Sequence, residues 1–115
     1  MSDINELTKK IIAFRNARDW KQFHNPKDLA LSLVLEASEV LEHFQWKNGK
    51  ELEKYIKENK KEISHELADT LYWLLTISHD LKIDLKKAFN EKMKINSQKY
   101  PVLKFKGRSE KYNKL

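Results

Sequence analysis

The sequence has no cysteine and very little glycine or proline. Its 115 residues include two glycines and two prolines. The absence of cysteine excludes disulfide bonds and thiolate metal sites, and nothing in the composition suggests secretion. So few helix-breaking residues, in a chain rich in leucine, lysine, glutamate and isoleucine, favour an all-α protein.

Long hydrophobic runs are also absent. No apolar segment approaches the roughly 18 residues that a membrane span needs. The first ten residues are polar and do not resemble a signal peptide. The length fits a single domain over residues 1–115. We therefore expect a one-domain cytoplasmic protein with no membrane partner.

Apolar residues recur at helical spacing in successive segments. Capping residues or helix breakers bound these segments, as at Asn25-Pro26, which is typical of a helix start. Helices are expected at about residues 3–20, 26–46, 50–58, 60–81 and 84–100. Residues 102–105 show a weak alternation of the kind seen in strands. The pattern predicts an all-α, four-helix-bundle-like domain.

One pattern occurs twice, thirty residues apart, in residues 33–44 and 63–74. Each copy carries an acidic pair at the edge of its apolar stripe. The pairs are Glu36 with Glu39, and Glu66 with Asp69. Residues three apart are neighbours on one helix face. If the two apolar stripes face each other, all four carboxylates lie on one rim of the bundle.

Four carboxylates held together repel one another and lose hydration. Hard divalent cations relieve both effects, and oxygen ligands suit Mg²⁺ or Mn²⁺. The alternative is a set of ordinary surface acids, because 35% of the chain is charged. Glu39 and Glu42 are also three residues apart, although this pair has no special position, so the spacing alone is weak evidence for a metal site.

Histidine offers weaker metal patterns. Glu62 and His65 form one Glu-x-x-His unit, whereas di-iron bundles need two. Glu39 and His43 lack the further ligands of a zinc site. We therefore expect His43, His65 and His79 to be solvated or to cap helices.

The C-terminal residues 99–115 are strongly basic. Only Glu110 is acidic there, against Lys99, Lys104, Lys106, Arg108, Lys111 and Lys114. Six basic residues against one acid give the tail a charge of +5. The net charge of the whole chain is +6, so the rest of the chain is nearly neutral. A solvated terminus, nucleic-acid binding and contact with a polyphosphate all fit such a tail. On charge alone, a solvated terminus is the favoured interpretation.

Four segments together resemble the MazG-like, all-α nucleoside triphosphate pyrophosphohydrolases. They are RDWKQFH (18–24), EASEVLEHFQW (36–46), HELADTLYWL (65–74) and KMKINSQKYP (92–101). The resemblance is nearest to family members that act on dCTP. One departure lies between the first two acids, where family members often carry glycine and this chain has Ala37 and Ser38.

The resemblance implies roles for individual residues. It implies that catalysis and magnesium binding belong to Glu36, Glu39, Glu66 and Asp69, with Glu36 or Glu39 as candidate general base. It implies a nucleobase pocket at Trp20, His24, Trp46 and Tyr72. It implies triphosphate contacts from Lys92 and Asn96, and from Lys99, Arg108 and Lys111 in the tail. Position beside an apolar stripe assigns Trp73 to the core or to an interface.

The implied reaction is Mg²⁺-dependent hydrolysis of a deoxynucleoside triphosphate, dCTP or a related one, to the monophosphate and pyrophosphate. This would serve nucleotide-pool house-cleaning in a homo-oligomer, a dimer or a tetramer. Alternatives are the same chemistry on dUTP or on modified or varied triphosphates, a non-catalytic nucleic-acid-binding module, and a structural bundle. Four acids on one rim argue against a nucleic-acid surface.

Overall fold

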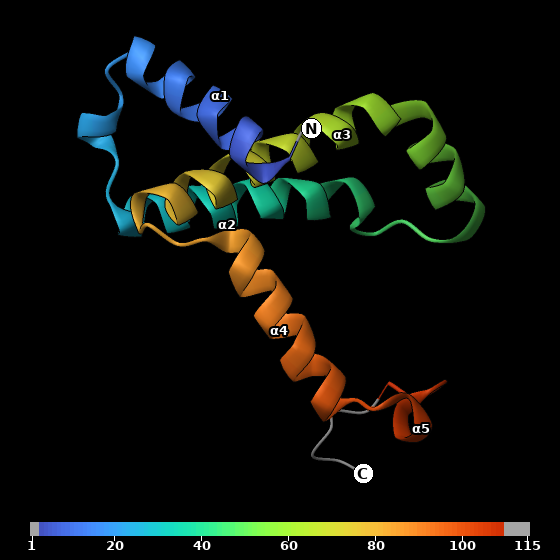
Figure 1. Ribbon diagram of the computed structural model, residues 1–115. Coiled ribbons are helices and arrows are strands. Elements are labelled where there is room, and N and C mark those ends of the chain that lie inside the picture. The colour runs from blue at the N-terminus through green and yellow to red at the C-terminus, as the bar shows by residue number, and fades with distance from the viewer. Residues whose placement is uncertain (1–2, 110–115) are drawn as a thin grey trace. The chain divides into compact units, whose positions relative to one another are not determined.

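The computed structural model describes residues 3–109, and helices dominate them (Figure 1). The elements are α1 (Ile4–Ala17), the short 3₁₀ helix η1 (Lys21–Phe23), α2 (Pro26–Phe44), α3 (Gly49–Asp80), α4 (Leu85–Lys99) and α5 (Val102–Phe105). Residues 3–109 contain no strand, so the all-α prediction is confirmed. The strand suggested by the weak alternation at 102–105 is wrong, because that segment forms the helix α5.

The chain divides into two compact units, one up to Lys82 and one from Ile83 onward. The first holds α1, η1, α2 and α3, and the second holds α4 and α5. That residues 1–115 form a single domain stays a prediction. Within the described part of the chain, no helix has both the length and the apolar character that crossing a membrane requires.

Side-chain caps set the starts of three helices where the sequence predicts them. A carboxylate or amide oxygen of Asp3, Asn25 and Asp84 accepts a hydrogen bond of 2.9–3.1 Å from the backbone N–H three residues later. Such caps satisfy N–H groups that have no partner inside the helix. Pro26 follows Asn25, where its missing N–H removes no helical hydrogen bond.

Helix α1 ends earlier than predicted, at Ala17 and not near Trp20. The backbone of Asp19 has φ 53°. This left-handed conformation ends the α-helical path and leads into η1. The turn places Trp20 beside the end of α1, where its backbone N–H donates to the carbonyl of Arg15 at 3.1 Å.

The two helices predicted at 50–58 and 60–81 form one continuous element with a break at Asn59. The φ and ψ of Asn59 are −120° and 21°, outside the helical range. Its side-chain amide donates to the carbonyl of Tyr55 at 3.0 Å. A side chain that bonds the neighbouring backbone competes with the helical ladder, which accounts for a kink here.

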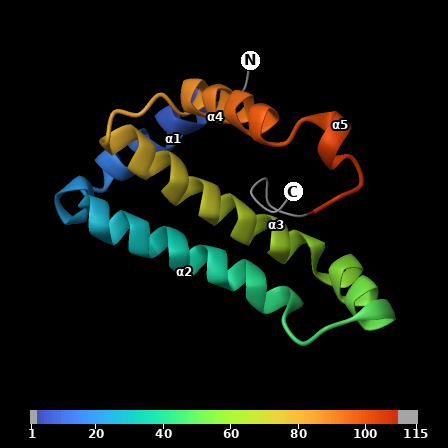
Figure 2. The same cartoon turned by 90° about the horizontal axis from the view of Figure 1, so that it is seen from below.

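Helices α2 and α3 run antiparallel, side by side (Figure 2). The buried hydrophobic side chains among the described residues are Leu29 on α2 and Ile63 and Leu75 on α3. Leu41 and Leu67 belong to the predicted core stripes, yet they are 59% and 54% exposed. The apolar stripe is therefore wider than the surface that the α2–α3 contact covers.

A buried ion pair joins α1 to the end of α3. The guanidinium of Arg15, 1% exposed, donates to both carboxylate oxygens of Asp80 at 2.8 and 2.9 Å. These hydrogen bonds, together with the positive charge of Arg15, hold the pKa of Asp80 below its usual value against the opposing effect of burial. The pair fixes the position of α1 on α3 by a two-pronged contact.

We expect Asp80→Asn to lower the free energy of unfolding by about 3 kcal/mol, because it leaves the buried guanidinium without its counter-ion. Urea unfolding at pH 7 measures this. Asp80 has a lowered pKa in the folded state, so its stabilising effect is present above the unfolded pKa of about 3.9 and is lost at lower pH. The difference between parent and variant should therefore shrink below about pH 4.

Glu58→Gln is the matched control. Glu58 pairs with Lys54 at 4.0 Å, and both side chains are more than half exposed. Such surface pairs contribute roughly 0–1 kcal/mol. Equal losses in the two variants would contradict a structural role for the Arg15–Asp80 pair.

Candidate active site

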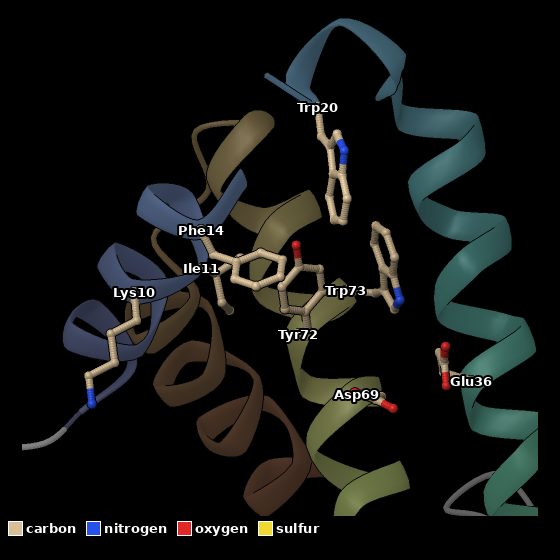
Figure 3. A pocket seen from close by; sticks show the side chains of 8 residues that line it. All are labelled: Lys10, Ile11, Phe14, Trp20, Glu36, Asp69, Tyr72 and Trp73. Carbon is tan, nitrogen blue, oxygen red and sulfur yellow. The ribbon is translucent and has the colours of Figure 1, made fainter. Parts of the chain in front are cut away.

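A pocket of about 460 Å³ lies among α1, α2 and α3, within the first unit of the chain. It is lined by Lys10, Ile11, Phe14, Trp20, Glu36, Asp69, Tyr72 and Trp73. Figure 3 shows two parts to this lining, an aromatic group and an acidic pair. Glu36 extends from α2 toward Asp69 on α3 (Figure 3). The pocket thus joins two of the predicted metal ligands to two of the predicted base contacts, Trp20 and Tyr72.

The other three predicted carboxylates lie close enough to Glu36 to act on it. Burial raises the pKa of Glu36, and the neighbouring Glu39, Asp69 and Glu66 raise it further. The two acidic pairs therefore meet at Glu36, across antiparallel helices. An acid with a perturbed pKa at a pocket is typical of functional sites.

The donor set fits a hard divalent cation. Glu36 Oε2 is buried and accepts no hydrogen bond. A buried carboxylate oxygen without a donor is costly, and a bound cation would remove that cost. Among residues 3–109, no three acidic or histidine side chains already form a closed metal-binding group. Binding therefore requires side-chain rotation, and the role of the four acids as ligands stays a prediction.

Aromatic rings form the other wall of the pocket. The Phe14 ring packs edge-on against Trp20 and Tyr72, with centroid distances of 5.6 and 6.3 Å. Tyr72 in turn packs edge-on against Trp73 at 5.0 Å. Trp73 is half-buried and lines the pocket beside Tyr72, and its place in the core or at an interface stays a prediction. It lies next to the apolar stripe, where core and pocket-lining residues share one periodicity.

His24 does not line the pocket and instead supports its wall. Arg15 Nη1 lies 3.4 Å from His24 Nδ1, and the imidazole packs edge-on against Trp73 at 5.5 Å. Burial lowers the pKa of His24, and the charge of Arg15 lowers it further. This favours a neutral ring that accepts from Arg15 and holds Trp73 in place.

Trp46 lies away from this pocket. Its side chain is 88% exposed and its backbone has φ 68°. It follows Glu36 by ten residues, or about 15 Å along α2 and its extension. Trp20 precedes α2, so the two tryptophans lie on opposite sides of the acids along this helix. A single chain therefore does not place both Trp20 and Trp46 at the same nucleobase.

The comparison with known proteins identifies the family. The model of the MazG-like family matches residues 31–115. The chain belongs to the MazG-like family. It is 36% identical to dCTP pyrophosphatase 1 of Rattus norvegicus and 35% identical to that of Homo sapiens, over 100% of this chain and 67% of each relative. This chain thus spans about two thirds of their length.

A solved structure supports the fold assignment. The crystal structure of a pyrophosphatase from Archaeoglobus fulgidus matches with a TM-score of 0.80 at 35% identity. The match covers 88% of this chain and 94% of that chain. The fold and family expected from the four sequence segments are therefore confirmed.

The predicted triphosphate contacts of this MazG-like chain lie in its second unit. Lys92 and Asn96 are four residues apart on α4 and share one face. Lys99 and Arg108 also belong to this unit. Lys111 lies outside the described residues. Contact of these side chains with the substrate stays a prediction.

Three pocket-lining residues of α1 are not among the predicted site residues, namely Lys10, Ile11 and Phe14. The side chain of Phe14 is 42% exposed. Lys10 and Phe14 are four residues apart, so they share one face of α1. Their helical spacing is that of core residues, and the sequence offers no signal that separates the two cases.

His43 also differs from its prediction. It was expected to be solvated or capping, but its side chain is only 12% exposed. It hydrogen-bonds the Tyr55 hydroxyl at 2.6 Å and contacts Glu66. Tyr55 is twelve residues away, and the direction in which the kink at Asn59 turns this part of α3 is not encoded in the sequence spacing.

We expect Glu36→Gln to raise the melting temperature of the metal-free protein at pH 7. The raised folded pKa of Glu36 means that its ionised form destabilises the fold above its unfolded pKa of about 4.3. The parent should therefore lose stability as the pH rises from about 4 to 7, and the variant should lose less. Thermal melts in the presence of a chelator measure this.

Glu42→Gln is the control, because Glu42 is exposed on the same helix. The assigned repulsion at Glu36 would be contradicted if both variants shifted the melting temperature equally.

Proposed function

We propose that the protein hydrolyses dCTP or a related deoxynucleoside triphosphate to the monophosphate and pyrophosphate, with Mg²⁺ as cofactor and Mn²⁺ as a substitute. The enzyme class follows from its relatives: this chain is a nucleoside triphosphate pyrophosphohydrolase. Two curated relatives are dCTP pyrophosphatases and the solved neighbour is a pyrophosphatase. The base preference and the metal are the proposed parts.

The observation that supports the proposal most is the composition of the pocket. Its acids, Glu36 and Asp69, adjoin the aromatic group of Phe14, Trp20 and Tyr72. Bases stack on aromatic side chains, and phosphates are bound beside divalent cations. The volume of about 460 Å³ falls in the range of small-molecule sites. A nucleotide needs these two environments next to each other.

Glu36, Glu39, Glu66 and Asp69 are the residues that would hold magnesium. When bound, the ion neutralises phosphate charge, which these acids alone would repel. Glu36 or Glu39 is the candidate general base, and in the metal-free protein burial and the acidic neighbours raise the pKa of Glu36. The base takes the proton of the water that attacks the α-phosphorus, while the α–β bond breaks and pyrophosphate leaves. Lys92 and the basic tail would stabilise the leaving group.

Hydrolysis of dUTP or a modified triphosphate needs the same acids and differs only at the base. The Tyr72 hydroxyl faces into the pocket in Figure 3, and burial raises the pKa of this group. It is therefore a neutral hydroxyl that both donates and accepts. The non-catalytic nucleic-acid module is disfavoured, because the acids of the pocket would repel a phosphate backbone.

We further propose a homo-oligomer in which Trp46 contacts a substrate bound by another copy. Trp46 lies away from the pocket of its own chain and is 88% exposed. Large apolar side chains on the surface of α2 and α3 are the candidate interface. They are Leu31, Val34, Leu35, Leu41, Leu67 and Leu71. Large exposed apolar patches are typical of protein–protein contacts.

The reaction is tested by pyrophosphate release from dCTP, dUTP, the other common triphosphates and base-modified ones, with and without Mg²⁺. We expect release from dCTP or a related substrate that stops when Mg²⁺ is removed. Asp69→Asn should abolish turnover and leave the helical circular dichroism unchanged, because it removes a charged ligand at the pocket. Full turnover of this variant at saturating Mg²⁺ would contradict the assigned site.

We expect Trp20→Ala to raise the KM for dCTP by roughly tenfold to hundredfold, because base stacking contributes about 1–3 kcal/mol. Trp46→Ala should raise KM as well without changing the thermal melt, since this exposed side chain has little packing to lose. Steady-state kinetics and melts of both variants measure this. Unchanged KM in Trp46→Ala would remove this residue from the base site and leave the proposal for Trp20 intact.

A further inference from the structure

A polar chain of three side chains ends at Glu66, one of the four predicted metal ligands. The Tyr55 hydroxyl lies 2.6 Å from His43 Nδ1, and His43 Nε2 contacts Glu66 Oε2. The side chains of His43 and Glu66 are 12% and 27% exposed. The contact to Glu66 is an ion-pair contact that lacks the alignment of a hydrogen bond.

The chemistry of the three groups fixes the direction of the hydrogen bonds when the imidazole is neutral. An ionised carboxylate only accepts, so His43 Nε2 carries the proton that faces Glu66. The other ring nitrogen, Nδ1, is then an acceptor. The Tyr55 hydroxyl is therefore the donor to His43, and it selects the tautomer in which His43 donates to Glu66.

Both supporting residues are themselves held in position. His43 lies in the last turn of α2, and Tyr55 lies in α3 before the kink at Asn59. The Asn59 amide donates to the Tyr55 carbonyl at 3.0 Å, and Lys47 Nζ lies 4.2 Å from the centroid of the Tyr55 ring. The kink thus turns the first part of α3 so that the Tyr55 hydroxyl meets the end of α2.

We propose that His43 and Tyr55 are positioning residues that orient Glu66 for the divalent cation. His43 engages one carboxylate oxygen and leaves the other for the ion. This inference rests on the metal site of the proposed function. Outer partners of this kind fix the orientation of a ligand, and their loss typically weakens metal binding 10–100-fold. His43 is not itself a ligand in this arrangement, because its Nε2 faces Glu66.

The test is a calorimetric titration of the nucleotide-free protein with Mn²⁺ alone. We expect His43→Leu to weaken Mn²⁺ binding by about tenfold or more. His43→Gln should retain more affinity, because its amide both accepts from Tyr55 and donates to Glu66. Tyr55→Phe should give a smaller loss in the same direction, since it removes only the hydroxyl.

Melts of the metal-free variants separate positioning from packing. His43→Leu should lower the melting temperature only in part and stay folded, because it leaves the Tyr55 hydroxyl and Glu66 without their partner, and His43→Gln should melt closer to the parent. Adding Tyr55→Phe to His43→Leu should cause no further loss of affinity, because the hydroxyl then has no imidazole to orient. Ser64→Ala is the control, since Ser64 donates only within its own helix, to the Lys60 carbonyl at 2.8 Å.

Parent-like Mn²⁺ affinity in His43→Leu overturns the inference, and so does tighter binding by the leucine than by the glutamine variant. A ¹⁴N coupling in the electron spin-echo spectrum of bound Mn²⁺ that disappears in His43→Leu would make His43 a ligand and also overturns it. Absence of Mn²⁺ binding by the parent overturns the metal site as well. If the variants lose affinity but the parent hydrolyses no triphosphate, the inference holds and the proposed function fails.

Discussion

The site depends on one constraint, which is that several carboxylates are held close together between α2 and α3. Packing of the two helices brings Glu36, Glu39, Glu66 and Asp69 together, and it leaves Glu36 partly buried with an oxygen that has no donor. Without a counter-ion this arrangement opposes the fold that creates it. This part of the structure therefore favours positive charge, which a divalent cation would supply.

Helix α3 connects this acidic region to the aromatic wall. Glu66, Asp69 and Tyr72 follow one another at intervals of three residues, so each lies about 4.5 Å further along the helix. The Arg15–Asp80 pair holds α1 on the same helix, and α1 carries Phe14. The rise of α3 thus sets the distance between the acidic and the aromatic parts of the nucleotide site. Helix α1 completes the aromatic part with Phe14.

Local rules made most of the fold predictable. Capping oxygens at Asp3, Asn25 and Asp84 and the break near Asn59 are local features, and the repeated acidic pairs predicted the facing of α2 and α3. The pocket wall was only partly predictable, because Trp73 and Phe14 have core-like periodicity. The contact of His43 with Tyr55 depends on how a kink directs a helix, which sequence spacing does not encode. Residues on α4 belong to a separate unit, so their relation to the site was not accessible from local pattern either.

The backbone at Trp46 has a consequence for how this protein works. A bulky residue in the left-handed region costs about 1–2 kcal/mol, and glycine would avoid that cost. At 88% exposure the indole recovers little of it through burial within its own chain. A turn optimised only for folding would carry a small residue here. The segment between α2 and α3 therefore presents an outward-facing aromatic side chain at a cost to the stability of the isolated chain.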